Sequence, residues 1–332
     1  MTNRKIARIE RALDALEPLE ADCTLCPREC RVDRRRERTG ICRSGRRADL
    51  SIALLHFGEE PVLSGLPDGP KPAPGVQGSR RGSGTMFFSG CNLKCLFCQN
   101  YQISWLHQGR EVEDEELAAI MLGLQQQGAL NINLVSPTHL VLPILRALRI
   151  AFSRGLDIPI VYNTNGYEKA AVIEHLAGIV DIYLPDLKYH SSEVSQKYSG
   201  AADYFRRAAP AIQEMYVQQP DLVLGGDGTA RQGLIIRHLI LPAHTDDSLD
   251  VLDWIARKLP LATAMSLMSQ YRPCHRAPEE LRRPLSAEEY RRVTDAAKRL
   301  GFENLFLQPG LFAPDEHLVP DFDRPQPFRW KK

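Results

Sequence analysis

Three closely spaced cysteines give the clearest chemical signal in the sequence. Cys91, Cys95 and Cys98 follow the pattern Cys-x3-Cys-x2-Cys, directly after an apolar run at residues 85–89. Thiolates are soft ligands that suit zinc or iron–sulfur clusters. Three thiolates from one short loop can bind three irons of a four-iron cluster and leave the fourth iron open to another ligand. The alternative is a zinc knuckle that a distant Cys or His completes.

A second group of cysteines lies in a polar segment near the N-terminus. Cys23, Cys26, Cys30 and Cys42 offer four thiolates, which suffice for a tetrahedral zinc or for a second four-iron cluster. Because this short segment has little apolar core, metal binding would supply much of its folding free energy. Loosely ordered free thiols are the alternative. The remaining cysteine, Cys274, stands alone and is predicted to be an ordinary core or surface thiol.

The elements that must position these cysteines alternate between short apolar runs and amphipathic segments. Strands rich in Ile, Val and Leu, each followed by a helix, are typical of a parallel sheet. Six or seven such units predict an α/β fold, a closed or partly open β/α barrel. The predicted strands are residues 85–89, 131–136, 158–163, 180–186, 234–241, 263–268 and 304–308. The predicted helices are residues 113–127, 139–154, 168–177, 209–218, 248–259 and 286–300.

Polar residues follow several of the predicted strands. Cys91 follows the first strand, Thr138 and His139 the second, Thr164 the third and Lys188 the fourth. Active sites of β/α barrels lie at the carboxyl ends of their strands. We therefore expect these side chains to meet at one mouth of the barrel.

Composition divides the chain into four parts. Residues 1–50 combine a charged amphipathic helix with the Cys-rich segment, and residues 51–84 are predicted to be a Gly/Pro-rich linker. Residues 85–310 are the predicted barrel and residues 311–332 a C-terminal tail. The basic run at residues 34–38 is either a solvated face or a patch for nucleic acid or an acidic partner.

Charge and hydropathy exclude several classes of protein. The net charge of +1 provides no global attraction to nucleic acid or to a membrane, which argues against both as partners. No apolar run approaches the roughly 20 residues of a membrane span, and residues 1–20 lack the apolar core of a secretion signal. The predicted compartment is the cytoplasm, where clustered cysteines indicate metal rather than disulfides.

The loop that carries Cys91, Cys95 and Cys98 resembles that of the radical S-adenosylmethionine (SAM) superfamily, and Phe97 fits the same pattern. The resemblance is to the group called pyruvate formate-lyase activating enzyme-like proteins. It implies a partial (β/α) barrel of radical SAM type, a [4Fe–4S] cluster on the three cysteines, and SAM chelated to the open iron. The segments that carry it are residues 23–30, 56–61, 82–91, 98–101, 131–139, 183–189 and 237–242.

The resemblance also implies a contact to the methionine amino group of SAM after the second strand. Activating enzymes usually have a Gly-Gly-Glu turn there, whereas this chain has Ser136, Pro137, Thr138 and His139. Thr138, His139 or a backbone carbonyl is therefore expected to replace the glutamate. For His139, a place at the helix start without any ligand role is the alternative.

Later strand ends resemble the part of activating enzymes that binds the methionine carboxylate. Asn163 and Thr164 begin a run similar to their Asp-Thr-Asn-Gly turn, and Asp186 and Lys188 match their Asp-x-Lys. The resemblance implies a monovalent cation beside the carboxylate and a contact from Lys188 to that carboxylate. Asn163 removes one negative charge from the cation site, and a snorkelling surface lysine is the alternative for Lys188. Arg237 lies inside an apolar strand and needs either SAM nearby or a buried ion pair.

The resemblance implies an oxidoreductase that cleaves SAM reductively to methionine and a 5′-deoxyadenosyl radical, which abstracts hydrogen from a substrate. It also implies a flavodoxin- or ferredoxin-type electron donor. The first hypothesis is a protein or peptide substrate, including a partner that receives a glycyl radical. The second is a small metabolite or RNA. The third, from another class, is a metal-binding interaction protein without catalysis.

Overall fold

The structure, a computed structural model, describes residues 2–36, 39–65, 81–308 and 318–328. Residues 66–80 of the predicted linker lie outside the described residues. So do residues 37–38 of the basic run, 309–310 at the end of the predicted barrel, and 311–317 and 329–332 of the predicted tail.

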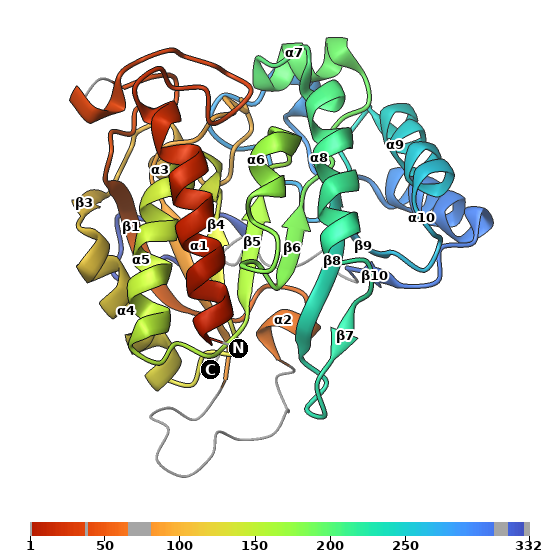
Figure 1. The fold of residues 1–332 in the computed structure, drawn as a ribbon. Coiled ribbons are helices and arrows are strands. Elements are labelled where there is room, and N and C mark those ends of the chain that lie inside the picture. Colours follow the sequence, from red (N-terminus) through yellow and green to blue (C-terminus); the bar gives the residue numbers. More distant parts are fainter. Residues whose placement is uncertain (1, 37–38, 66–80, 309–317, 329–332) are drawn as a thin grey trace.

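Helices and strands alternate along most of the chain (Figure 1). The helices are α1 (Thr2–Leu16), α2 (Pro61–Ser64), α3 (Tyr101–Ser104), α4 (Asp114–Gln126), α5 (Val141–Ser153), α6 (Ala170–Glu174), α7 (Ser192–Ser199), α8 (Tyr204–Gln218), α9 (Thr245–Lys258) and α10 (Ala287–Leu300). The strands are β1 (Ala48–His56), β2 (Ser83–Phe88), β3 (Arg110–Val112), β4 (Ile132–Val135), β5 (Ile160–Thr164), β6 (Ile182–Pro185), β7 (Val223–Leu224), β8 (Ala230–Leu239), β9 (Ala264–Met268) and β10 (Leu305–Leu307).

All the strands belong to one sheet with the order β10-β9-β8-β6-β5-β4-β2-β1-β3, and β7 pairs with β8 off this path. The neighbours from β10 to β2 are parallel, whereas β1 is antiparallel to both β2 and β3. The path has two ends, so the described strands do not close into a complete barrel. The predicted partial (β/α) barrel is confirmed.

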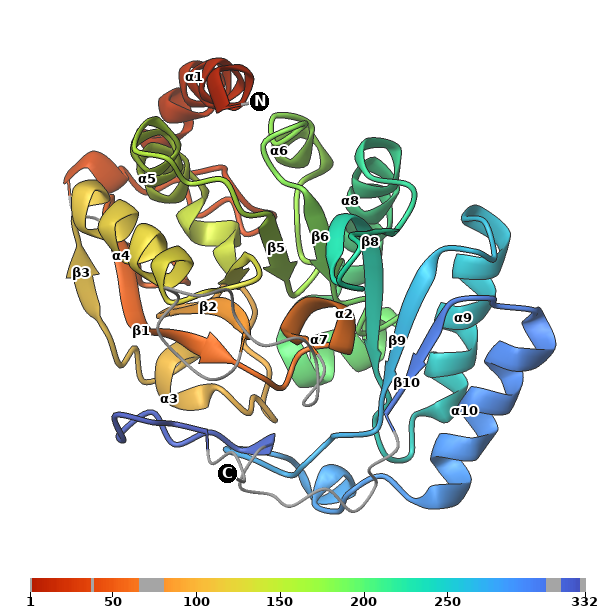
Figure 2. The ribbon, with the colours of Figure 1, turned by 90° about the horizontal axis from the view of Figure 1, so that it is seen from below.

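Helices cover the outer, convex face of the curved sheet (Figure 2). α5 is apolar on most sides because it lies between the sheet and α1. α1 adds an outer layer and buries Ile9, Leu13 and Leu16. Burial of such an apolar stripe is the main source of stability for an amphipathic helix. The predicted N-terminal helix is therefore part of the same core as the barrel.

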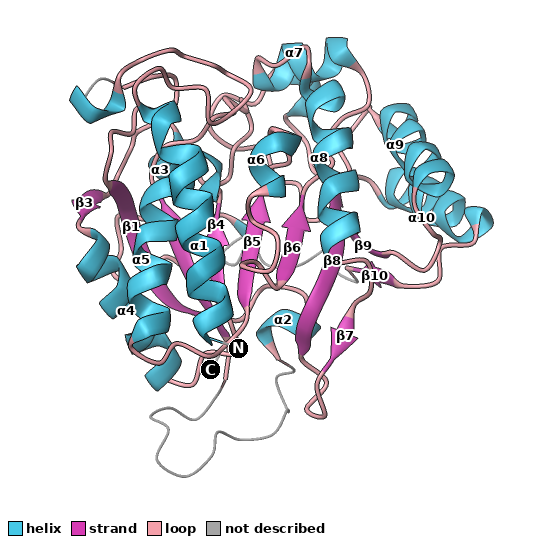
Figure 3. Cartoon of the chain, in the orientation of Figure 1, coloured by secondary structure: helices cyan, strands magenta, loops and turns pink. Residues whose placement is uncertain are grey.

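The structure differs from the prediction at the border of the predicted linker (Figure 3). Residues 51–56 belong to β1, which forms the antiparallel edge of the sheet with β2 and β3. β1 is followed by the four-residue α2 and not by a long amphipathic helix. The alternation of strands and helices that marks the parallel strands therefore did not reveal it. α7 was also not predicted, although Ser191 caps its start by accepting from the Val194 N–H at 3.3 Å, and Gly200 ends it with a φ of 62°.

Candidate active site

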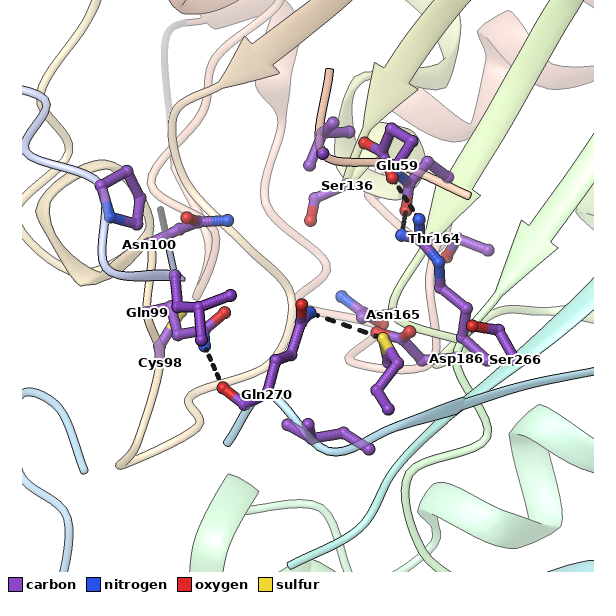
Figure 4. Close-up of a pocket in the computed structure, with 18 of the residues that line it drawn as sticks. Glu59, Cys98, Gln99, Asn100, Ser136, Thr164, Asn165, Asp186, Ser266 and Gln270 are labelled. Carbon is purple, nitrogen blue, oxygen red and sulfur yellow. Dashed lines mark hydrogen bonds and ion pairs between the residues drawn. The ribbon is translucent and has the colours of Figure 1, made fainter. Parts of the chain in front are cut away.

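A cavity of about 620 Å³ lies at the carboxyl ends of the parallel strands. The cysteine loop after β2 lines it, and so do residues at the carboxyl ends of β4, β5, β6 and β8. Late strands and the C-terminal segment complete it, and Gln99 of the loop donates to the Gln270 carbonyl at 3.2 Å (Figure 4). Of the side chains predicted to meet at the strand ends, Cys91, Thr164 and Lys188 line this cavity.

Cys91, Cys95 and Cys98 all line the cavity, on a loop without regular structure between β2 and α3. Each sulfur has a polar neighbour. The Leu93 N–H donates to the Cys91 sulfur at 3.4 Å, the Ser199 hydroxyl donates to the Cys95 sulfur at 3.0 Å, and the Ser104 hydroxyl lies 3.2 Å from the Cys98 sulfur. Donors of this kind stabilise metal-bound thiolates.

The electrostatics of the loop favour thiolates that bind metal over free thiolates. Burial raises the pKa of Cys91 and Cys95 above the ordinary value, and it raises the pKa of Cys98 to about 12. The Lys188 ammonium opposes this effect at Cys95. A metal centre provides the positive charge that buried thiolates need. The three residues therefore fit a [4Fe–4S] cluster with one open iron.

No group of three or more His, Cys, Asp or Glu side chains in the described parts of the chain is arranged to hold a single metal ion. Both cysteine groups instead line cavities.

Asp186 and Lys188, just after β6, also line the cavity (Figure 4 labels Asp186). Lys188 Nζ donates to Asp186 Oδ2 at 2.5 Å, and both side chains are mostly buried. Asn163 and Thr164 line the same cavity from the end of β5. Four of the predicted strand-end residues therefore lie together.

Thr138 and His139, in contrast, are not among the residues that line this cavity. Thr138 Oγ1 donates to Glu168 Oε1 at 2.5 Å, and His139 Nε2 lies 2.9 Å from the Ser89 carbonyl. Ser136 is the residue from this turn that does line the cavity, and its φ of 56° is in the left-handed region. The predicted role of Thr138 and His139 as direct SAM contacts is not supported by this placement.

Arg237 forms a buried ion-pair cluster with Glu59 and Glu60, which precede α2. Its Nε donates to Glu60 Oε1 at 2.9 Å and its Nη2 to Glu60 Oε2 at 2.6 Å, and Nη2 also contacts Glu59. All three line the cavity, with two carboxylates against one guanidinium. The sequence indicated that Arg237 needs a partner, but the two glutamates lie in the predicted linker and were missed.

Tyr204 is a second residue that the sequence did not reveal. Its hydroxyl lies 2.8 Å from the carbonyls of Asn165 and Asp186, and it accepts from the Lys188 N–H at 3.0 Å. The hydroxyl therefore joins the ends of β5 and β6. Gly166 permits this approach, because a Cβ there would lie 2.1 Å from the Asp186 carbonyl.

The four N-terminal cysteines come together as their spacing predicted. Cys23, Cys26, Cys30 and Cys42 line one small cavity, separate from the large one. Asn92, which lies in the loop of Cys91, Cys95 and Cys98, lines it as well. The head, defined here as residues 17–47, therefore packs directly against the loop of Cys91, Cys95 and Cys98.

The comparisons with known proteins agree with this geometry. The family model described as Radical SAM superfamily matches residues 85–228. An uncharacterized protein of Methanocaldococcus jannaschii is 30% identical over 297 residues, which cover 86% of this chain and 77% of that protein. The fold is a partly open α/β barrel with three thiols at its mouth. The chain belongs to the radical SAM superfamily.

Two solved structures of SuiB from Streptococcus suis are also similar. The one bound to S-adenosylmethionine is 15% identical, with a TM-score of 0.44 over 67% of this chain and 49% of that chain. The one bound to the precursor peptide SuiA is 16% identical, with a TM-score of 0.45 over 67% of this chain and 47% of that chain. The chain thus spans about half the length of these structures. Separately, none of the described helices is long and apolar enough to cross a membrane.

Proposed function

We propose that this chain cleaves SAM reductively and uses the product radical to abstract hydrogen from a protein or peptide, in the manner of activating enzymes. The observation that carries the proposal is the shared cavity of three loop thiols and the Asp186–Lys188 pair. When bound, a [4Fe–4S] cluster and SAM supply one-electron cleavage of the sulfonium to methionine and a 5′-deoxyadenosyl radical. Hydrogen transfer then gives 5′-deoxyadenosine and a substrate radical. The reducing electron comes from a flavodoxin- or ferredoxin-type donor.

Lys188 is proposed to bind the methionine carboxylate of SAM. Its ammonium is a point charge at the mouth of the barrel, and Asp186 holds it in place at 2.5 Å. The monovalent cation expected beside Asp186 stays a prediction. Lys188 already gives the Asp186 carboxylate a counter-charge.

Glu59 and Glu60 are proposed to accept a hydrogen bond from the methionine amino group of SAM, in place of the Gly-Gly-Glu turn of activating enzymes. Both line the cavity, and Arg237 neutralises only one of their two charges. The uncompensated negative charge favours a cation in the cavity.

The size of the cavity supports a protein or peptide substrate. A volume of about 620 Å³ lies in the range that holds one drug-sized ligand, so SAM would fill much of it. A substrate then needs to insert only a small reacting part, such as a backbone Cα–H or one side chain.

The central experiment measures methionine and 5′-deoxyadenosine after anaerobic reconstitution with iron, sulfide, dithionite and SAM. We expect both products from the unaltered chain and neither from the Cys91/Cys95/Cys98→Ala variant, with Cys274→Ala as the matched control that keeps activity. If the triple variant still cleaves SAM, or if no condition yields cleavage, the proposal fails and the non-catalytic alternative stands.

The substrate class is tested with a lysate from deuterium-grown cells, divided by size and treated with protease or ribonuclease. Deuterium should appear in 5′-deoxyadenosine with the macromolecular fraction, and protease should abolish the transfer. Transfer from the low-mass fraction alone would favour a metabolite, and loss on ribonuclease treatment would favour RNA.

A further inference from the structure

Arg34 is a buried cation that forms no ion pair with a carboxylate of the described residues. The residue is 2% exposed, and Nη1 donates to the His139 carbonyl at 2.7 Å. Its Nε and Nη2 are buried and have no partner. Within the described stretches of the chain, no carboxylate forms an ion pair with Arg34. Burial of an unpaired guanidinium is strongly unfavourable, so an anion is expected beside it.

The cavity beside Arg34 is the one lined by the four head cysteines. As neutral thiols they give Arg34 no counter-charge. Four thiolates around a divalent metal centre carry a net charge of about −2, and the same holds for a [4Fe–4S] cluster in its usual oxidised form. A metal centre in this cavity therefore supplies the missing anion.

Backbone groups are already directed at three of the four sulfurs. The Ile41 N–H donates to the Cys30 sulfur at 3.4 Å, and backbone hydrogen bonds from Leu25 and Arg28 reach Cys23 and Cys26. Gly40 leaves room for this arrangement, because a Cβ there would lie 2.6 Å from the Cys30 sulfur. N–H donors to sulfur are typical of the surroundings of thiolate-bound metals.

A second side chain with a buried polar atom that lacks a partner among the described residues also lines this cavity. His139 lines it, and Nδ1 of His139 has no hydrogen-bond partner. The cavity thus has orphaned polar groups on two side chains, and thiols on four. Hydrophobic packing explains none of them.

We propose that Cys23, Cys26, Cys30 and Cys42 bind a second metal centre, zinc or iron–sulfur, and that Arg34 balances its negative charge. This inference goes beyond the proposed SAM chemistry and does not depend on it. The centre lies beside Asn92, in the loop of Cys91, Cys95 and Cys98 that also lines the large cavity. Four thiolates suit either zinc or an iron–sulfur cluster.

The test uses the full-length Cys91/Cys95/Cys98→Ala chain, in which any remaining tightly bound metal belongs elsewhere. Zinc, iron and sulfide are measured per chain after purification in zinc-containing medium and after anaerobic reconstitution. We expect about one zinc or about four irons with sulfide. Adding Cys26→Ser should remove that metal, and adding Cys274→Ser should not. Circular dichroism shows whether the triple variant is folded. If it is folded and binds no more metal than its Cys26→Ser derivative, the proposal is overturned.

The role of Arg34 is tested in the same background by competition with a chelator. Arg34→Met should lower metal affinity about tenfold to a hundredfold, as for other groups that support metal ligands. Arg34→Lys should retain most of the affinity, and Arg35→Met, at an exposed arginine paired with Asp33, should retain all of it. Equal metal retention by Arg34→Met and the parent would show that Arg34 is not the counter-ion. Because the assay omits SAM, its outcome is independent of catalysis.

Discussion

The Lys188 ammonium lies 2.5 Å from the Asp186 carboxylate at the end of β6, and both side chains face the cavity that holds the three loop cysteines. Removal of Lys188 would leave the SAM carboxylate unpaired in a largely enclosed site. A hydrogen bond to a charged group contributes roughly 1.5–3 kcal/mol, so Lys188→Met should weaken SAM binding about tenfold to a hundredfold. Equilibrium dialysis with the reconstituted protein measures this.

Decarboxylated SAM sharpens that test, because it lacks the group that Lys188 is proposed to bind. Lys188→Met should leave its affinity nearly unchanged, and iron content should also be unchanged because no cluster ligand is lost. Lys258→Met, at an exposed position on α9, is the control for loss of a lysine. An equal loss for both ligands would assign Lys188 to the fold rather than to the carboxylate.

Glu60→Gln, unlike Lys188→Met, should weaken the binding of both SAM and decarboxylated SAM. If Glu59 and Glu60 accept a hydrogen bond from the methionine amino group, the substitution should weaken SAM and decarboxylated SAM alike, by about tenfold. Both ligands keep the amino group, so both lose the same charge-assisted hydrogen bond to a carboxylate. A loss confined to SAM itself would contradict the assignment, and full affinity for both would remove it.

Arg237→Met should destabilise the protein strongly, because it leaves Glu59 and Glu60 buried without their cation. Removing one partner of a buried pair typically costs about 3–5 kcal/mol. The measured quantity is the midpoint of thermal unfolding. Adding Glu59→Gln and Glu60→Gln to Arg237→Met should recover part of the loss, since no uncompensated charge then remains. If the triple variant is no more stable than Arg237→Met alone, the ion pairs are not the cause.

Glu168 should make stability depend on pH. Burial raises the pKa of its carboxyl from 4.5 to about 7, although Thr138 and Thr164 each donate to it at 2.5 Å. The folded state therefore holds this proton more tightly than the unfolded state. Its contribution is fully present below the unfolded pKa near 4.5 and is lost as pH rises through about 7.

The unfolding midpoint of the parent chain should thus fall between pH 5 and 7.5, by the equivalent of a few kcal/mol at most. Glu168→Gln should flatten this dependence, because it cannot ionise. Glu174→Gln, at an exposed position on α6, should keep the parental slope. If the unfolding midpoint of Glu168→Gln changes with pH as steeply as that of the parent chain, other groups cause the pH dependence.

The parallel strands and the loop of Cys91, Cys95 and Cys98 could be predicted because their signals are local. Buried strands such as β5 and β9 are mostly apolar runs between helices, and three cysteines within eight positions need no long-range information. The helix predicted at residues 286–300 is α10, which begins with a capping box of Ser286 and Glu289 and ends at Gly301.

Other features depend on pairings between distant parts of the chain. Arg237 lies 177 residues from Glu60, so its position inside a strand indicates a partner but cannot identify it. Thr138 was expected to bind SAM because it follows a strand, yet Glu168 lies 30 residues later and accepts its hydrogen bond. The hydrophobic periodicity of the sequence predicts the helix or strand to which a side chain belongs. The hydrogen-bond partner of its polar atom depends on which residues are its neighbours in the folded chain.

Arg28 connects the head to residues that are synthesised much later. It donates to the Asn92 carbonyl at 2.7 Å and to the Gly200 carbonyl, 172 residues downstream, at 2.6 Å. At roughly 5–20 residues per second, the ribosome needs roughly 10–30 s to make that stretch. During this interval the head cannot adopt its final packing, and Cys23, Cys26 and Cys30 remain accessible on the nascent chain. If the head binds metal as proposed, these thiols must stay reduced until the second half of the barrel has emerged.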